Sequence, residues 1–192
     1  MLERLINIKK IIPDEYQESI YDIDYQKLYD LGKRVVFFDL DNTIISYKEK
    51  EPTEKINNFF RNLESMGYEV LIVSNARKSR IKHFSDLAKL KYVYLSLKPT
   101  KFGFRRALKK CSRKYSKEEV LQIGDQLMTD IYGSKRSGYY TILVKAIDHK
   151  TEHLLTRINR IRERNVLNKI KKKDFDAYLK YLSEYDRDNL WS

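Results

Sequence analysis

The stretch Val35-Val36-Phe37-Phe38-Asp39-Leu40-Asp41-Asn42-Thr43 decides the fold that the sequence predicts. Its apolar run is short and uninterrupted, which is typical of a strand buried on both faces of a parallel sheet. Asp39 and Asp41 follow where that strand ends. Buried carboxylates are costly unless a cation compensates them, although Asp and Asn also favour ordinary turns. The stretch therefore predicts a central strand that brings two acidic groups to one edge of a sheet.

Further apolar runs alternate with helical patterns on both sides of this stretch. The expected strands are 33–39, Glu69–Val73, Tyr92–Leu95, Val120–Ile123 and Tyr139–Val144. Helices are expected between them, over 53–67, 77–90, 101–111 and 127–136. Strands that alternate with helices form parallel sheets with right-handed crossovers. The predicted fold class is α/β: a three-layer sandwich around a mainly parallel, five-stranded sheet.

The composition excludes several protein classes. The chain has 192 residues and one cysteine, Cys111, which excludes a disulfide scaffold and a cysteine-rich zinc site. No apolar run approaches the length of a transmembrane helix, and the first residues lack the apolar core of a secretory signal. We therefore expect a protein of the cytoplasm.

The net charge of +12 indicates an anionic partner, which could be nucleic acid, an acidic membrane or a phosphorylated substrate. The charge is uneven along the chain, and the segment 157–173 is dense in Arg and Lys. We divide the chain into an amphipathic and acidic lead-in (1–32), a catalytic core (33–146) and a basic helical C-terminal extension (147–192).

Polar residues follow the other predicted strands as well. Ser74 and Asn75 come after the second strand, Lys98 after the third, and Gly124 and Asp125 after the fourth. Ligands of such folds bind at the carboxyl ends of the strands. Each residue alone could be a cap, a turn or a surface lysine. Together they predict phosphate chemistry, with a hydroxyl and a lysine for the phosphate and carboxylates for Mg²⁺.

In this order the residues resemble the four motifs of the haloacid dehalogenase superfamily of phosphohydrolases. The resemblance implies a Rossmannoid core, with Asp39 as nucleophile and Asp41 as general acid and base. It implies phosphate binding by Ser74, Asn75 and Lys98. It implies Mg²⁺ binding by Asp39, Asp125 and the backbone carbonyl of Asp41, supported by Thr43, Gly124 and Asp130.

A closer resemblance, over about residues 10–172, is to the YqeG-type proteins of subclass IIIA and the related phosphatidylglycerophosphatases. It is carried by Ile12–Tyr16, Phe38–Thr43, Ile72–Asn75, Gly124–Ile131, Gly138–Val144 and Thr156–Arg160. The resemblance implies dephosphorylation of phosphatidylglycerophosphate to phosphatidylglycerol. The intervals Thr43–Ser74 and Ser74–Lys98 leave no room for a cap domain, and an uncapped site suits a bulky or surface-presented substrate.

The segment 157–173 adds a basic amphipathic pattern, which predicts peripheral contact with the inner face of the membrane. The same pattern suits a helix that packs its apolar face on the sheet. Two other functions stay open. One is a soluble phosphatase that acts on a nucleotide, a sugar phosphate or a phosphoprotein. The other is a nucleic-acid-binding module, which only the charge favours. The sequence does not predict an oligomeric state.

Overall fold

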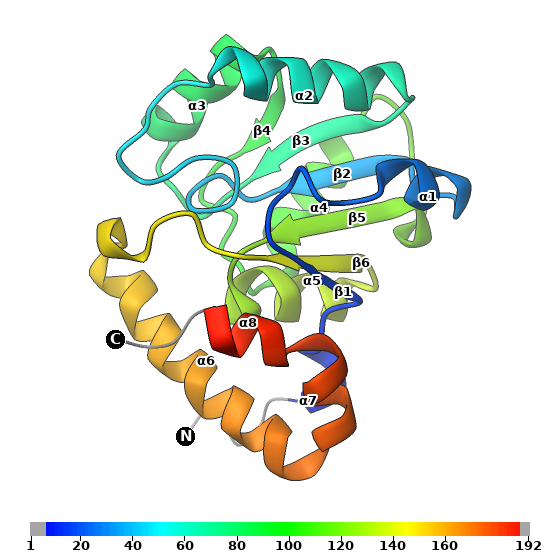
Figure 1. The fold of residues 1–192 in the computed structure, drawn as a ribbon. Helices are drawn as coiled ribbons and strands as arrows, with labels where there is room; N and C mark the ends of the chain where they lie inside the picture. The colour runs from blue at the N-terminus through cyan, green and yellow to red at the C-terminus, as the bar shows by residue number, and fades with distance from the viewer. Residues whose placement is uncertain (1–6, 189–192) are drawn as a thin grey trace.

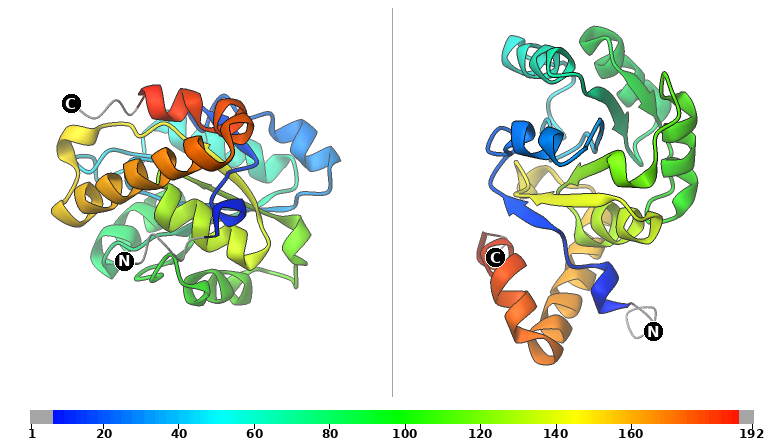
Figure 2. Two further views of the ribbon diagram at one scale, coloured as in Figure 1. Left: turned by 90° about the horizontal axis from the view of Figure 1, so that it is seen from below. Right: turned by 90° about the vertical axis from the view of Figure 1, so that its right-hand side faces the viewer.

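The computed structural model describes residues 7–188, apart from the side chain of Leu155. In this part of the chain, all strands form one parallel sheet in the order β1-β6-β5-β2-β3-β4, with helices on both faces (Figures 1 and 2). The strands are β1 (Glu15–Gln17), β2 (Val35–Phe38), β3 (Glu69–Val73), β4 (Lys91–Val93), β5 (Val120–Gly124) and β6 (Tyr140–Val144). The α/β fold class is confirmed, with six strands in place of the five predicted.

The central strand β2 contributes to a core on each face of the sheet, because its side chains alternate in direction. Val36 and Phe38 join one core, while Val35 and Phe37 join the other. All four side chains are fully buried. The uninterrupted apolar run of the sequence thus reflects a strand covered on both sides.

The additional strand, β1, lies within the predicted lead-in at 1–32. It pairs with β6, with Glu15 opposite Ile142. Asp14 fixes this pairing, because its carboxylate accepts the backbone N–H of Thr141 at 2.8 Å. The lead-in also forms helix α1 (Tyr25–Asp30), which Asp24 caps. Residues 15–30 are therefore part of the sheet and its covering layer, and residues 1–6 lie outside the described part.

The helices between the strands lie close to the predicted ranges. They are α2 (Glu54–Ser65), α3 (Lys78–Ala88), α4 (Lys101–Lys110) and α5 (Tyr132–Ser137), with a π-helical turn at Leu127–Ile131 before α5. Helices α2 and α4 start at Thr53 and Thr100, whose hydroxyls accept backbone N–H groups of the first turn. Between Thr43 and Lys98 the chain forms only a loop, α2, β3, α3 and β4, so no cap domain is inserted there.

The C-terminal helices are α6 (Leu154–Lys173), α7 (Phe175–Tyr181) and α8 (Ser183–Asp188). They pack beside the β1 end of the sheet (Figure 1). A third core contains Ile11, Leu127, Ile131 and Leu143. The C-terminal segment contributes six further buried residues to it, which are Val166, Leu167, Ile170, Tyr178, Leu182 and Tyr185. No helix in 7–188 is long and apolar enough to span a bilayer.

Candidate active site

The carboxyl ends of β2, β3 and β5 lie next to one another. Phe38 is opposite Ile72 on one side and Ile123 on the other. Asp39 follows β2, Ser74 follows β3 and Asp125 follows β5. The parallel sheet therefore brings residues far apart in the sequence to one edge, as predicted.

Three carboxylates meet at this edge. Asp39, Asp125 and Asp130 each offer an oxygen, and these oxygens lie within 4.8 Å of one another. Asp125 and Asp130 have no exposed surface, and Asp39 is 5% exposed. The carboxylate of Asp41 lies outside this group, and the resemblance assigns only its backbone carbonyl to the metal. Asp130, predicted as a supporting residue, is within the group.

Lys98 lies between two of these carboxylates. Its Nζ is 2.7 Å from Asp39 Oδ1 and also pairs with Asp130. Burial opposes the charge of Lys98, but the two carboxylates outweigh it and raise its pKa. Burial likewise raises the pKa of Asp130 to about 6, against the attraction of Lys98. Lys98 therefore remains a cation within hydrogen-bond distance of the predicted nucleophile.

The buried cluster carries more negative than positive groups. Its cations are Lys98 and Arg160, and its carboxylates are Asp39, Asp125, Asp130, Glu152 and Glu163. Burial raises the pKa of Asp125 well above its usual value, with Arg160 opposing the shift. A divalent cation held by oxygen ligands would balance most of this excess. The residues present thus fit Mg²⁺.

The carboxylate of Asp41 forms an ion pair with Arg80 of α3, a residue that was not predicted from the sequence. Arg80 Nε donates to Asp41 Oδ1 at 2.7 Å, and its terminal nitrogens donate to the carbonyls of Ser46 and Glu49 at 3.1 and 2.8 Å. Burial and the nearby Asp39 raise the pKa of Asp41, while Arg80 opposes them. Arg80 therefore holds both the predicted acid and the short loop 46–49 that follows it.

The residues predicted to bind phosphate differ in their surroundings. Ser74 is buried at the end of β3, and its hydroxyl accepts the N–H of Ala76 at 3.2 Å. Asn75 holds the backbone of Lys98, since Oδ1 accepts the Lys98 N–H at 2.8 Å and Nδ2 donates to its carbonyl at 3.1 Å. In this structure Asn75 positions Lys98.

Two further predicted residues support the acidic cluster. The hydroxyl of Thr43 donates to Asp125 Oδ1 at 3.0 Å. At Gly124, a Cβ atom would lie 2.4 Å from Cγ of Asp130, so a side chain there would displace this carboxylate. Gly124 therefore permits Asp130 to approach the end of β5.

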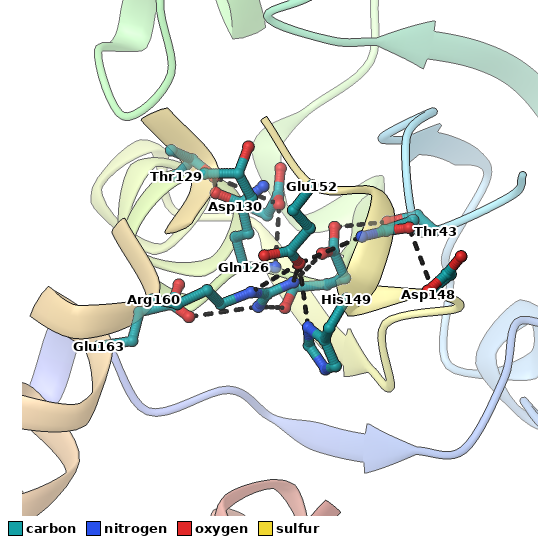
Figure 3. A network of polar contacts seen from close by, with 12 residues as sticks. Thr43, Gln126, Thr129, Asp130, Asp148, His149, Glu152, Arg160 and Glu163 are labelled. Atoms are coloured by element: carbon teal, nitrogen blue, oxygen red, sulfur yellow. Dashed lines mark hydrogen bonds and ion pairs between the residues drawn. The ribbon is translucent and has the colours of Figure 1, made fainter. Parts of the chain in front are cut away.

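Arg160 of α6 contacts Asp125 from the C-terminal extension. It also bonds Glu152 and Glu163, which lie beside it in Figure 3. It is one of the bases of 157–173, the segment whose pattern predicts either contact with a membrane or packing on the sheet, and it is only 3% exposed. Arg160 and Glu163 share the helix face of Leu167 and Ile170, at intervals of three and four residues. Glu163 is also the single acidic residue of α6. An opposite-charge pair on the apolar face was the signal for a buried ion pair.

Comparison with known proteins agrees with this geometry. The family model of the haloacid dehalogenase-like hydrolases matches residues 6–138. The chain is 35% identical over 165 residues to "Probable phosphatase YqeG" of Bacillus subtilis (strain 168), covering 86% of this chain and 94% of that protein.

Two solved structures are also similar. A putative HAD superfamily (subfamily III A) hydrolase from Legionella pneumophila has a TM-score of 0.45 and 13% identity, covering 83% of this chain and 98% of that one. An uncharacterized protein from Listeria monocytogenes serotype 4b has a TM-score of 0.47 and 18% identity, covering 71% of this chain and 98% of that one.

Proposed function

Because the chain belongs to the haloacid dehalogenase-like hydrolases, we propose that it is a Mg²⁺-dependent phosphomonoesterase that uses Asp39 as its nucleophile. The observation that carries this proposal is the buried group of Asp39, Asp125 and Asp130 around Lys98. Nothing in a turn or a helix cap explains three buried carboxylates together. A metal-assisted phosphoryl transfer gives them a role, because carboxylates can hold the metal and one of them can attack phosphorus.

The residues have distinct roles in the proposed reaction. A carboxylate oxygen of Asp39 attacks phosphorus, and the bond from phosphorus to the alcohol oxygen of the substrate breaks. Lys98 offsets the negative charge of the phosphate as the carboxylate approaches. Asp41 gives a proton to the departing oxygen and then takes one from the water that hydrolyses the aspartyl phosphate. Ser74 binds a phosphate oxygen through its hydroxyl.

Mg²⁺ would be held by Asp39, Asp125 and the backbone carbonyl of Asp41, where it supplies charge neutralisation for the phosphoryl group. Asp130 and Thr43 would orient these ligands through Lys98 and Asp125.

For the substrate we propose an anionic phospholipid with a terminal phosphate, phosphatidylglycerophosphate. The resemblance to phosphatidylglycerophosphatases supports this choice, as does the absence of a cap domain between Thr43 and Lys98. A third support is an exposed apolar stripe on α6, formed by Leu154, Ile158 and Ile161, which are 73%, 38% and 63% exposed. The stripe lies opposite the buried face of the helix.

Exposed bases flank the α6 stripe. Arg157 and Arg164 lie on one side of it and Arg162 on the other, at helical spacing. An apolar stripe between bases suits the surface of an anionic bilayer, where each base contributes about 1 kcal/mol. The start of α6 contacts the loop 46–49 that follows Asp41, since the hydroxyls of Thr156 and Tyr47 are 3.0 Å apart.

The direct test is phosphate release from phosphatidylglycerophosphate in mixed micelles. We expect release with Mg²⁺, none with a chelator, and a preference for the lipid over glycerol phosphate and nucleotides. Cleavage of soluble phosphomonoesters with an inert lipid would contradict the lipid substrate and favour a soluble phosphatase. If the folded protein with Mg²⁺ cleaves no phosphomonoester and binds nucleic acid in a salt-sensitive way, the result would favour a nucleic-acid-binding module.

The double variant Ile158→Glu/Ile161→Glu tests the α6 stripe. We expect its binding to vesicles with anionic lipid to fall about tenfold or more, because two apolar side chains are lost and two negative charges gained. Sedimentation with vesicles measures this binding. Activity on a soluble phosphomonoester is expected to stay unchanged. Asn165→Glu/Asn168→Glu adds the same two charges to exposed positions of α6 without removing an apolar group, and is the matched control. Equal vesicle binding by double variant and wild type would contradict membrane contact through the stripe.

A further inference from the structure

Arg160 links the C-terminal helices to the acidic cluster through two contacts with one residue, Asp125. Its Nη2 forms an ion pair with Asp125 Oδ2, and its Nη1 donates to the backbone carbonyl of Asp125 at 2.8 Å. A guanidinium that holds both the carboxylate and the carbonyl of one residue fixes that side chain relative to its own backbone. The second carboxylate oxygen, Oδ1, accepts the hydroxyl of Thr43 instead.

All N–H groups of Arg160 are engaged by the protein. A guanidinium has five N–H groups. Nε donates to Glu152 Oε1 at 3.0 Å, and Nη2, besides its contact with Asp125, donates to the same oxygen at 2.9 Å. Nη1 also reaches Glu163 Oε2 at 3.2 Å and the hydroxyl of Tyr185 at 2.9 Å. No donor remains for a substrate phosphate. Arg160 is therefore placed to orient Asp125, and it does not bind substrate itself.

The segment that follows β5 is held by α6 at another point. Glu163 Oε1 accepts the backbone N–H of Met128 at 3.0 Å. This segment carries both Asp125 and Asp130, so α6 restrains the backbone between two members of the acidic cluster. Tyr185 connects α8 to the same network, with its hydroxyl 2.9 Å from Glu163 Oε2.

The loop after β2 joins the network through Glu152. Glu152 Oε1 accepts a hydrogen bond from Asn42 Nδ2 at 3.1 Å and another from the guanidinium of Arg160. Asn42 lies between Asp41 and Thr43 in the sequence. The two loops that supply the proposed metal ligands are therefore joined to each other through Glu152 and Arg160.

We propose that Arg160 is a positioning residue that holds Asp125 in the orientation needed to bind Mg²⁺. The helices α6, α7 and α8 are then a structural part of the metal site. This inference rests on the proposed function only in assigning Mg²⁺ to the acidic cluster. Groups that orient a metal ligand in this way typically contribute 10- to 100-fold to metal affinity, by order of magnitude.

The test is the affinity of the full chain for Mg²⁺, measured by calorimetry without substrate. We expect Arg160→Gln to bind Mg²⁺ about 10- to 100-fold more weakly than wild type. Arg162→Gln removes the same charge from an exposed position two residues away and is the matched control, with unchanged affinity. Wild-type affinity in folded Arg160→Gln would overturn the inference.

Arg160→Gln leaves Glu152 and Glu163 buried without their cation, so its fold is checked by circular dichroism. If it does not fold, Arg160→Lys and Tyr185→Phe decide the question. Lysine keeps the charge but cannot make the two-point contact, and phenylalanine removes only one hydroxyl. Both are expected to bind Mg²⁺ more weakly than wild type, and unchanged affinity in both would overturn the inference.

The affinity measurement separates this inference from the proposed function. Weaker Mg²⁺ binding by the Arg160 variants, in a chain that cleaves no phosphomonoester, would support the inference and overturn the proposed function. Phosphatase activity with wild-type Mg²⁺ affinity in the variants would do the reverse. A wild-type chain that binds no Mg²⁺ would overturn both.

Discussion

Asp39→Asn is expected to lower kcat for phosphomonoester hydrolysis by roughly 10⁴- to 10⁶-fold, the scale on which an enzyme loses its nucleophile. The amide has nearly the shape of the carboxylate, but it is a poor nucleophile and a weaker metal ligand. Single-turnover measurements at saturating Mg²⁺ would show the loss. Mass spectrometry of acid-quenched protein is expected to detect a phosphorylated Asp39 in wild type and none in the variant.

Asp86→Asn is the matched control for this change. Asp86 lies on α3 with its side chain 53% exposed, where it forms an ion pair with Lys82. The same substitution there is expected to leave both kcat and the phosphorylated intermediate unchanged. Phosphorylation of Asp39→Asn at another residue would contradict the assignment of the nucleophile.

Lys98→Met is expected to lower the free energy of unfolding in a chelator by about 3–5 kcal/mol, the usual cost of removing one partner from a buried ion pair. The Lys98 side chain is 2% exposed, and its loss leaves Asp39 and Asp130 close together without a cation. Urea denaturation measures the change. Mg²⁺ is expected to restore part of the loss, because a cation bound only by the folded state stabilises it.

The control for this variant is Lys101→Met. Lys101 is exposed at the start of α4. The substitution Lys101→Met therefore removes a positive charge without leaving buried carboxylates unpaired. Its unfolding free energy is expected to match that of wild type. An unchanged free energy of unfolding of Lys98→Met in chelator would mean that the two carboxylates do not need this cation.

The phosphatase activity of Lys98→Met is expected to fall by about 10²- to 10³-fold, as for loss of one electrostatic contact in a transition state.

The central part of the fold could be predicted because its signals are local. The run Val35–Phe38 reads as a strand buried on both faces without reference to any other segment. The polar residues after β2 and β5 then meet because neighbouring parallel strands end at the same edge. For the same reason, the approach of Asp39 to Asp125 follows from the order of strands and helices alone.

Strand β1 could not be predicted in this way. Glu15, Tyr16 and Gln17 are all half-buried and carry no apolar run or alternation. What makes them a strand is their pairing with β6, more than 120 residues later, and the contact of Asp14 with Thr141. Its extended conformation depends on tertiary contacts, which local propensity does not report.

The two arginines of the site were missed for a related reason. Arg80 and Asp41 are 39 residues apart, and Arg160 and Asp125 are 35 apart. A long charged side chain in an exposed helix and one in a buried ion pair look alike in the sequence unless the helix face is considered. The basic pattern of 157–173 suits both a membrane surface and packing on the sheet, and it is Leu167 and Ile170, on the same face as Arg160, that lie in the core.

Contacts between the N-terminal part of the chain and the C-terminal helices can form only late during synthesis. Tyr16 donates to Asp188 at 2.7 Å, and Arg160 pairs with Asp125 from a helix that follows the whole sheet. A nascent chain leaves the ribosome from its N-terminus onward, so Asp39, Lys98 and Asp125 emerge before α6 and α8. Until those helices follow, Asp125 has no guanidinium partner and β1 has no Asp188. If the acidic cluster holds Mg²⁺ as proposed, its full affinity is therefore expected only once residues 154–188 have emerged and packed beside the sheet.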